Sequence, residues 1–306
     1  MHKVERVAIL GAGAMGALFA AKFWDAGGFA TTLIAGGERG ERLRRDGLVV
    51  NGRTYHIPVV DPGAGGPPAD LILVALKHHH LSRAVPDLRN AVGEDTTILS
   101  LMNGLDSEQI LGAAYGLDRV LYGVSVGIDP LRHGNRVTYT TTGKHYFGQA
   151  TNRPPSEQVR RVQAAFARAG LVYESPPDMI RVLWWKFMIN VGMNPLSAVM
   201  RAPYGVFQSS SDAQALMETL MLEVIALARA EDIDLTEQDI ADWYRALHTL
   251  SPTGQTSMLQ DVEAGRKTEI EIFAGKVVEL GHKHGIPTPV NETMLRLIRV
   301  LEEHPA

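Results

Sequence analysis

The sequence predicts an α/β domain followed by an all-α domain. Up to residue 175, apolar runs of strand length alternate with helical segments, as in a sheet with helices packed on it. A glycine-rich turn directly follows the first of these strands. After Ser175-Pro176-Pro177 the pattern changes to helices alone. The 306 residues suffice for two domains of common size. We therefore expect an α/β domain over residues 1–175 and a helical domain over residues 176–306.

Composition excludes several classes of function. The net charge of −4 argues against non-specific binding of nucleic acid. The sequence contains no cysteine, which excludes disulfides, thiolate nucleophiles and cysteine-ligated zinc. No stretch reaches the roughly 20 apolar residues of a membrane span. Lys3 and Arg6 precede an apolar run as in a secretory signal, but three glycines interrupt that run. We expect a cytoplasmic protein that binds neither nucleic acid nor membrane.

The first strand, Val4–Leu10, leads into a glycine motif and then an Ala-rich helix that ends near Ala26. The motif is GxGxxG, formed by Gly11, Ala12, Gly13, Ala14, Met15 and Gly16. The first glycine permits a tight turn, the second lets the backbone approach a pyrophosphate, and the third lets helix and strand pack closely. Free N–H groups at the helix start then face the phosphates. We predict a Rossmann-type dinucleotide-binding domain; the alternative is a glycine-rich turn without a ligand.

The second strand, Thr31–Ala35, is followed by two glycines instead of the acidic residue that favours NAD. Arg39 and Arg42 lie just beyond it. Either side chain could reach the 2′-phosphate of NADP, and the alternative is that both are solvated helix residues.

Further strands place polar residues at their carboxyl ends, where open α/β sheets bind ligands. Lys77 follows the strand Leu71–Leu76, and Asn103 follows the strand Thr96–Leu101. The alternatives are a solvent-facing loop lysine and an Asn-Gly turn. His78, His79 and His80 are adjacent on a helix and point in different directions, so we expect no metal site there.

The remaining pattern of the first domain completes the expected sheet. We predict a hairpin over Gly47–Val60 with Asn51-Gly52 as its turn. The other predicted elements are strands at Val120–Val126, Arg136–Thr141, His145–Gly148 and Leu171–Glu174, and a helix at Ser156–Ala169.

The second domain opens with an apolar helix, Asp178–Met200, that carries Lys186, Asn190 and Asn194 four residues apart. This spacing puts all three on one helix face. Asparagine is unfavourable inside helices, so two of them one turn apart suggest a polar cavity. The alternative is a ladder of buried asparagines without a ligand.

Five more helices are predicted: Asp212–Glu231, Thr236–Leu247, Ser257–Ala264, Ile270–His284 and Asn291–Glu303. Dense polar residues join two of them, in the stretch Ser257–Glu271. Glu269 falls near the expected start of a helix, where the dipole favours an acid whether or not it has another function.

These segments together resemble the ketopantoate reductase (2-dehydropantoate 2-reductase) family. The resemblance rests on GAGAMG, the strand ending in Lys77, Asn103-Gly104, the Trp184–Leu196 segment and the stretch SMLQDVEAGRKTEIE. It covers nearly the whole chain and implies NADPH-dependent reduction of a 2-keto acid to a 2-hydroxy acid, with ketopantoate or a close analogue as substrate and NADH as the less favoured cofactor. It leaves a homodimer open.

The resemblance also implies roles for individual residues. Lys186 is the general acid and Glu269 assists it. Asn190, Asn194 and Ser257 line the substrate pocket, Lys77 and Asn103 contact cofactor and substrate, and the glycine motif contacts the cofactor. Arg39 is expected at the cofactor from its place after the second strand and not from the resemblance. A lysine ammonium suits the acid role because hydride transfer to a ketone develops negative charge on oxygen.

Two positions depart from the family pattern: Gly36 replaces a common arginine, and Tyr204 replaces a pocket asparagine. The tyrosine predicts better reduction of a flatter or more apolar 2-keto acid than of ketopantoate. Two other functions remain open: a related dehydrogenase of imine or opine-like substrates, and a protein that senses NADP(H) without catalysis. The sensor would need the glycine motif but neither the Lys186 stripe nor Glu269.

Overall fold

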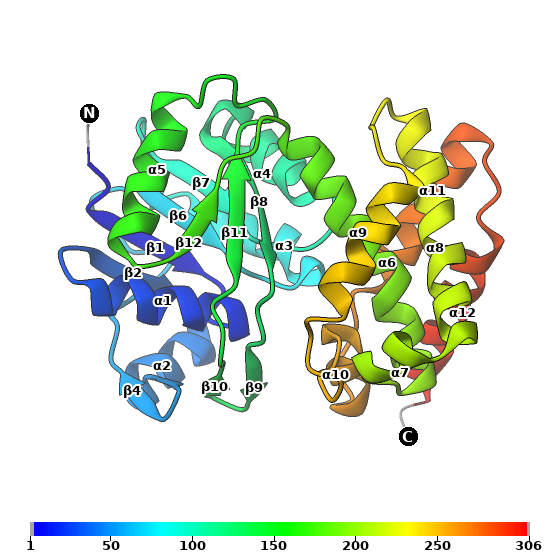
Figure 1. Cartoon of the computed structure of the whole chain (residues 1–306). Helices are drawn as coiled ribbons and strands as arrows, with labels where there is room; N and C mark the ends of the chain where they lie inside the picture. Colours follow the sequence, from blue (N-terminus) through cyan, green and yellow to red (C-terminus); the bar gives the residue numbers. More distant parts are fainter. Residues whose placement is uncertain (1–2, 305–306) are drawn as a thin grey trace. The chain divides into compact units, whose positions relative to one another are not determined.

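The computed structural model describes residues 3–304, which divide between Val182 and Leu183 into two compact units. The first is an α/β unit and the second is built of helices (Figure 1). The boundary between them falls inside helix α6 (Met179–Met200), a little after the proline-containing segment where we expected it.

The first unit contains an eight-stranded sheet with the order β12-β11-β8-β7-β6-β1-β2-β5 (Figure 1). Its six strands from β8 to β5 are parallel. Their order is that of a doubly wound dinucleotide-binding sheet, which confirms the predicted Rossmann-type fold. β11 runs antiparallel to β8, and β12 runs parallel to β11. The strands are β1 (Arg6–Leu10), β2 (Ala30–Ile34), β5 (Val59–Val60), β6 (Leu71–Val74), β7 (Thr97–Ser100), β8 (Val120–Val126), β11 (Lys144–Gly148) and β12 (Val172–Glu174).

Helices cover both faces of this sheet because its strands are apolar on both sides. In β1, Val7 and Ile9 belong to one core with α1 (Ala14–Ala26) and α5 (Glu157–Arg168). Ala8 and Leu10 belong to a second core on the opposite face. That core includes α3 (His78–Ala84), the 3-10 helix η1 (Val85–Leu88) and α4 (Ser107–Tyr115).

A second sheet of four short strands, ordered β4-β3-β10-β9, follows α2 (Gly37–Asp46) and packs against α1. Asn51 and Gly52 have φ angles of 47° and 80° and form the predicted turn between β3 (Leu48–Val50) and β4 (Arg53–Tyr55). The predicted hairpin was too long, because Val59–Val60 leaves it and pairs with β2. The prediction missed β9 (Leu131–His133), which pairs with β10 (Arg136–Thr138). The 3-10 helix η2 (Leu117–Arg119) connects α4 to β8 in the main sheet.

The second unit is all-α, as predicted. Helix α8 (Ser211–Ala230) packs against α7 (Tyr204–Ser209), α9 (Glu237–Leu247), α11 (Ala274–His284) and α12 (Pro289–Glu303). It also lies very close to α6, since a Cβ at Gly192 would be 2.6 Å from the Met221 side chain. The remaining elements are α10 (Ser257–Glu263) and the 3-10 helix η3 (Ile270–Ile272). Within residues 3–304, no helix is long and apolar enough to cross a membrane.

The predicted helix Ile270–His284 was wrong over its first turn. The chain forms η3, breaks at Phe273 (φ −105°, ψ −95°), and only then enters α11. Ile270, Ile272 and Phe273 are all buried. Successive helix positions point about 100° apart, so one regular helix cannot bury these neighbours on a single face.

Candidate active site

One group of candidate site residues lies in the first unit, at the carboxyl ends of the strands of the main sheet. Ile34, Leu10, Val74 and Ser100 are the last residues of four neighbouring strands and pair in register. The chain connections reverse direction at β1, and α/β sheets bind nucleotides at the carboxyl ends of strands beside this reversal. The glycine motif follows β1 at this place, which fits the predicted nucleotide site.

Two glycines of the motif are required by the protein itself. Gly11 has φ +100°, and a Cβ there would lie 2.5 Å from the Ala75 carbonyl oxygen at the end of β6. At Gly16, a Cβ would lie 1.9 Å from the Gly11 carbonyl oxygen. Both positions therefore exclude any side chain, and they fold the loop tightly against the ends of β1 and β6.

Gly13 differs from its two neighbours in the motif. Its backbone is extended (φ −82°, ψ −161°), and a Cβ there would meet nothing closer than the Ala75 oxygen at 4.0 Å. The protein alone thus gives no steric reason for glycine at this position. Gly13 is also the N-cap of α1, and no side chain caps the amides of the first turn. An open glycine before an uncapped helix fits a bound pyrophosphate.

Lys77 and Asn103 reach the same edge from the two strands beyond β1. Lys77 is the N-cap of α3 after β6, and Asn103 follows β7. Both side chains are half-buried. Gly104 has φ +94°, so the Asn-Gly pair also forms a turn, as the alternative interpretation required. The structure brings the glycine motif, Lys77 and Asn103 to one edge of the sheet, while their roles remain predictions.

An arginine that the sequence analysis missed belongs with Arg39 and Arg42 of α2. Arg39 is exposed, yet the protein around its guanidinium displaces enough water to lower its pKa, and the positive charges of Arg132 and Arg42 lower it further. Arg132 lies on β9, whose turn to β10 contains Gly134-Asn135. This dipeptide is a hairpin signal and could have revealed the strand. Three arginines from α2 and β9 therefore create a concentrated positive charge.

A second group of candidate site residues lies in the helical unit, on α6, where Lys186, Asn190 and Asn194 share one face. The two asparagines are buried, with 4% and 6% exposure. Lys186 retains partial exposure, yet the surrounding protein displaces enough water to lower the pKa of its ammonium group to about 8 from the ordinary 10.5. Desolvation disfavours the charged form, so this lysine releases its proton more easily than a surface lysine does.

Asn194 joins this helix face to the start of α10. Its Oδ1 accepts hydrogen bonds from the Ser257 hydroxyl (3.2 Å) and the Met258 amide (3.3 Å). Its Nδ2 donates to the backbone oxygen of Asn190 at 3.2 Å. Both ends of the Asn194 amide are thus hydrogen-bonded within the protein, as the alternative of a buried asparagine ladder predicted. The same bonds bring Asn190, Asn194 and Ser257 together, as the predicted substrate contacts require.

Glu269 is buried and is the N-cap of η3, so it lies at the start of a helix as predicted, although this helix is a short 3-10 helix and not the long one expected. The neighbouring residue is firmly held. Thr268 donates from its backbone N–H (2.7 Å) and its hydroxyl (2.6 Å) to one oxygen of Glu302. The Thr268 hydroxyl also accepts from the Ile270 amide. These bonds fix the backbone on both sides of Glu269.

Tyr204 begins α7, and its aromatic ring packs on the turn that leads to α10. A Cβ at Gly254 would lie 2.9 Å from the ring, and the Tyr204 amide donates to the Gly254 carbonyl oxygen. Burial raises the pKa of the Tyr204 hydroxyl. The ring therefore lies close, along the chain and in space, to the segment that carries Ser257.

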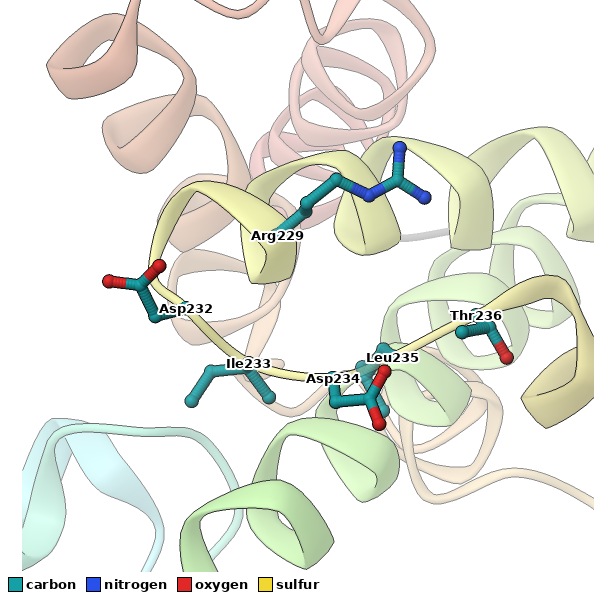
Figure 2. A pocket seen from close by; sticks show the side chains of 6 residues that line it. All are labelled: Arg229, Asp232, Ile233, Asp234, Leu235 and Thr236. Carbon is teal, nitrogen blue, oxygen red and sulfur yellow. The ribbon is translucent and has the colours of Figure 1, made fainter.

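Two hollows in the surface contain none of the predicted site residues. One of about 290 Å³ lies at the turn from α8 to α9, and Figure 2 shows its side chains. They are Arg229, Asp232, Ile233, Asp234, Leu235 and Thr236. Their charged ends do not converge on a common point (Figure 2). The other, of about 280 Å³, is an apolar groove over β1 and β2. No group of three or more potential metal ligands occurs among residues 3–304.

A doubly wound domain with an open glycine loop, joined to a helical domain, is typical of dinucleotide-dependent oxidoreductases. Comparison with known proteins identifies the family. Residues 7–152 match the family described as ketopantoate reductase PanE/ApbA, and residues 178–302 match its C-terminal part. The chain belongs to the ketopantoate reductase family.

Relatives and solved structures agree with this assignment. A 2-dehydropantoate 2-reductase of Archaeoglobus fulgidus is 30% identical over 98% of this chain and 99% of its own. The structure of 2-dehydropantoate 2-reductase from Geobacter metallireducens has a TM-score of 0.85 and 27% identity, over 96% of this chain and 99% of that one. A D-mandelate dehydrogenase bound to NADH shares the fold, with a TM-score of 0.89 and 23% identity, over 97% of this chain and 98% of that one.

Proposed function

We propose that this protein uses NADPH to reduce a 2-keto acid to the 2-hydroxy acid, with ketopantoate or a close analogue as substrate. The observation that carries the proposal is the stripe on α6, where a lysine of lowered pKa shares one face with two buried asparagines. The family supports the same reaction, because its curated relatives are named 2-dehydropantoate 2-reductase.

The proposed chemistry assigns the proton to Lys186. A bound reduced nicotinamide supplies hydride to the keto carbon. Lys186 donates a proton to the keto oxygen as negative charge develops there, and a pKa near 8 leaves it mostly protonated at neutral pH while easing its release. Glu269 assists as a carboxyl group in a fixed position, because the hydrogen bonds of Thr268 hold the backbone on both sides of it.

Neutral polar side chains orient the substrate. Asn190 and Ser257 offer donors and acceptors suited to a carboxylate and a hydroxyl. Asn194 acts on the substrate mainly through Ser257, because its own oxygen already accepts two hydrogen bonds. We expect the ring of Tyr204, which packs beside this segment, to reduce the space available for a branched, hydroxylated substrate.

The cofactor preference follows from charge. Gly36 lacks the side chain by which many family members are expected to bind the 2′-phosphate. Arg39, Arg42 and Arg132 raise the local positive charge just beyond it, and their mutual repulsion would be relieved by a phosphate. This arrangement favours NADPH over NADH.

We also propose that the protein forms a homodimer through its helical unit. Leu216 and Leu222 on α8, and Leu297 and Val300 on α12, are large apolar side chains left exposed to solvent. Sedimentation velocity measures the assembly, and a single monomeric species at micromolar concentration would contradict it.

Replacing Lys186 by alanine tests the proposed acid. We expect kcat to fall by about 10²–10⁴-fold, the usual contribution of a positioned acid, with the affinity for NADPH unchanged. In the wild type, kcat/KM should fall as pH rises above about 8, and this decline should vanish in the variant. Lys276→Ala on α11 is the matched control, a partly buried lysine paired with Glu279. Normal turnover and a normal pH profile in the Lys186 variant would make this lysine structural.

A further inference from the structure

A buried glutamate, Glu108, lies in the first turn of α4, directly after the loop that carries Asn103. Its exposure is 1%, and its Oε1 atom forms no hydrogen bond with the described residues. The reaction proposed above does not use it. A buried carboxyl with an unpaired oxygen costs stability, and a hydrophobic residue of similar size would avoid that cost.

Three hydrogen bonds connect Glu108 to the other end of this loop. The Ser107 hydroxyl donates to Glu108 Oε2 at 2.9 Å. The hydroxyls of Ser107 and Ser100 are 2.7 Å apart. Since the Ser107 hydroxyl hydrogen already points to the carboxylate, the Ser100 hydroxyl is the donor to the Ser107 oxygen. The Ser100 oxygen in turn accepts from the Met102 amide at 3.4 Å. The bonds form one directed chain from Met102 to Glu108.

This chain fixes both ends of the loop 101–106. Ser100 is the last residue of β7 and Ser107 is the first residue of α4. Both are buried. Met102, whose amide joins the chain, immediately precedes Asn103. The end of β7 also packs tightly against β8, because a Cβ at Gly123 would lie 2.1 Å from the Ser100 carbonyl oxygen. Asn103 therefore lies on a loop whose two ends are held by hydrogen bonds between buried polar groups.

The charge of Glu108 depends on its surroundings. Burial raises the pKa of its carboxyl to about 7, while hydrogen bonds from Ser107 and from the backbone amides of Glu108 and Gly123 lower it and the charge of Asp106 raises it. On β8, burial raises the pKa of Tyr122, and the charge of Glu108 adds to that rise. An ionised carboxylate can only accept a hydrogen bond, so it fixes the direction of the chain.

We propose that Glu108 is a positioning residue: through Ser107 and Ser100 it holds the Asn103 loop in the geometry that the nicotinamide and the substrate require. This inference rests on the proposed function in one respect, namely that Asn103 contacts those molecules. Glu108 itself touches neither.

Four variants test the chain of hydrogen bonds. Glu108→Ala removes the terminal acceptor, and Ser107→Ala breaks the chain while leaving the carboxyl in place. Each should lower kcat on the order of 10–100-fold, because a misplacement near 1 Å can cost that much. The double variant should be no slower than the slower single variant, since both changes break one chain. Glu108→Gln keeps an acceptor for Ser107 and should retain most of the turnover.

Glu157→Ala is the matched control. Glu157 occupies the first turn of α5 in the same unit and is exposed. A purely structural role for Glu108 predicts lower thermal stability in Glu108→Ala but normal kcat in the protein that remains folded. That outcome, or additive losses in the double variant, would overturn the proposal.

Amide hydrogen exchange gives a readout that does not depend on turnover. Glu108→Ala and Ser107→Ala should speed exchange at the Met102 amide by about tenfold or more, while amides in the β7 interior stay protected. Unchanged exchange at Met102 would refute the proposal even if the wild type reduced no keto acid. A wild type that binds NADPH without turnover would refute only the proposed function.

Discussion

A side chain at Gly13 should weaken cofactor binding strongly without harming the fold. The nearest atom to an added Cβ is 4.0 Å away, and the backbone conformation suits any residue. Gly→Ala at a compatible position stabilises by about 0.4–1 kcal/mol, while alanine is a poorer N-cap than glycine by a similar amount. We expect the free energy of unfolding of Gly13→Ala to stay within about 1 kcal/mol of the wild type.

Cofactor affinity should respond quite differently. A methyl group at this position takes the space through which the pyrophosphate approaches, and we expect NADPH to bind about 100-fold more weakly, or about 2.7 kcal/mol. Gly13→Asp adds a negative charge. At about 4 Å from a phosphate and an effective dielectric constant near 20, the repulsion is about 4 kcal/mol, which corresponds to roughly a further 10³-fold.

Two measurements test this reasoning. Fluorescence titration gives the Kd for NADPH, and urea denaturation gives the free energy of unfolding. Gly16→Ala is the contrasting variant, because its Cβ would lie 1.9 Å from the Gly11 oxygen. It should lose about 1–3 kcal/mol or more of stability from overpacking. Folded Gly13 variants with wild-type affinity would remove the glycine loop from the cofactor site.

Three further predictions follow from charge and shape. Lys186→Met should raise the free energy of unfolding at pH 7 by up to about 3 kcal/mol, because the native pKa lies about 2.5 units below 10.5. This gain should shrink as pH rises from 8 to 10.5, and a less stable variant in urea denaturation would contradict it. Replacing Arg39 and Arg42 by alanine should lower the affinity for NADPH much more than the affinity for NADH, with Arg45→Ala on α2 as control. Equal losses of affinity would show that Arg39 and Arg42 do not bind the phosphate. Tyr204→Asn should raise kcat/KM for ketopantoate relative to an aromatic 2-keto acid. The prediction is refuted if the wild type already prefers ketopantoate and the substitution does not raise kcat/KM for it.

Much of the fold could be predicted because local patterns determine it. The GxGxxG motif after β1 fixed the first crossover, and the change to helical periodicity after Pro177 marked the second domain. The secondary-structure predictions were wrong where contacts distant in sequence determine the backbone conformation. Val59–Val60 pairs with β2 instead of extending a hairpin, and the burial of consecutive residues around Phe273 interrupts a helix.

The candidate site was only partly visible in the sequence. Lys186, Asn190 and Asn194 followed from helical spacing, which is a local property. The bond from Ser257 to Asn194 spans 63 residues, and Arg132 joins Arg39 only through a second sheet, so neither arrangement could be read locally. The chain from Glu108 to Met102 gave no sequence signal, because a glutamate in the first turn of a helix is ordinarily a solvated one.

The central claim is most directly tested by NADPH oxidation with a panel of 2-keto acids, ketopantoate included. Absorbance at the nicotinamide band is followed with wild type and with Lys186→Ala, both first shown to bind NADPH. We expect stoichiometric formation of the 2-hydroxy acid by the wild type and at least about 100-fold slower oxidation by the variant. Tight NADPH binding without oxidation by any keto acid in the panel would contradict it.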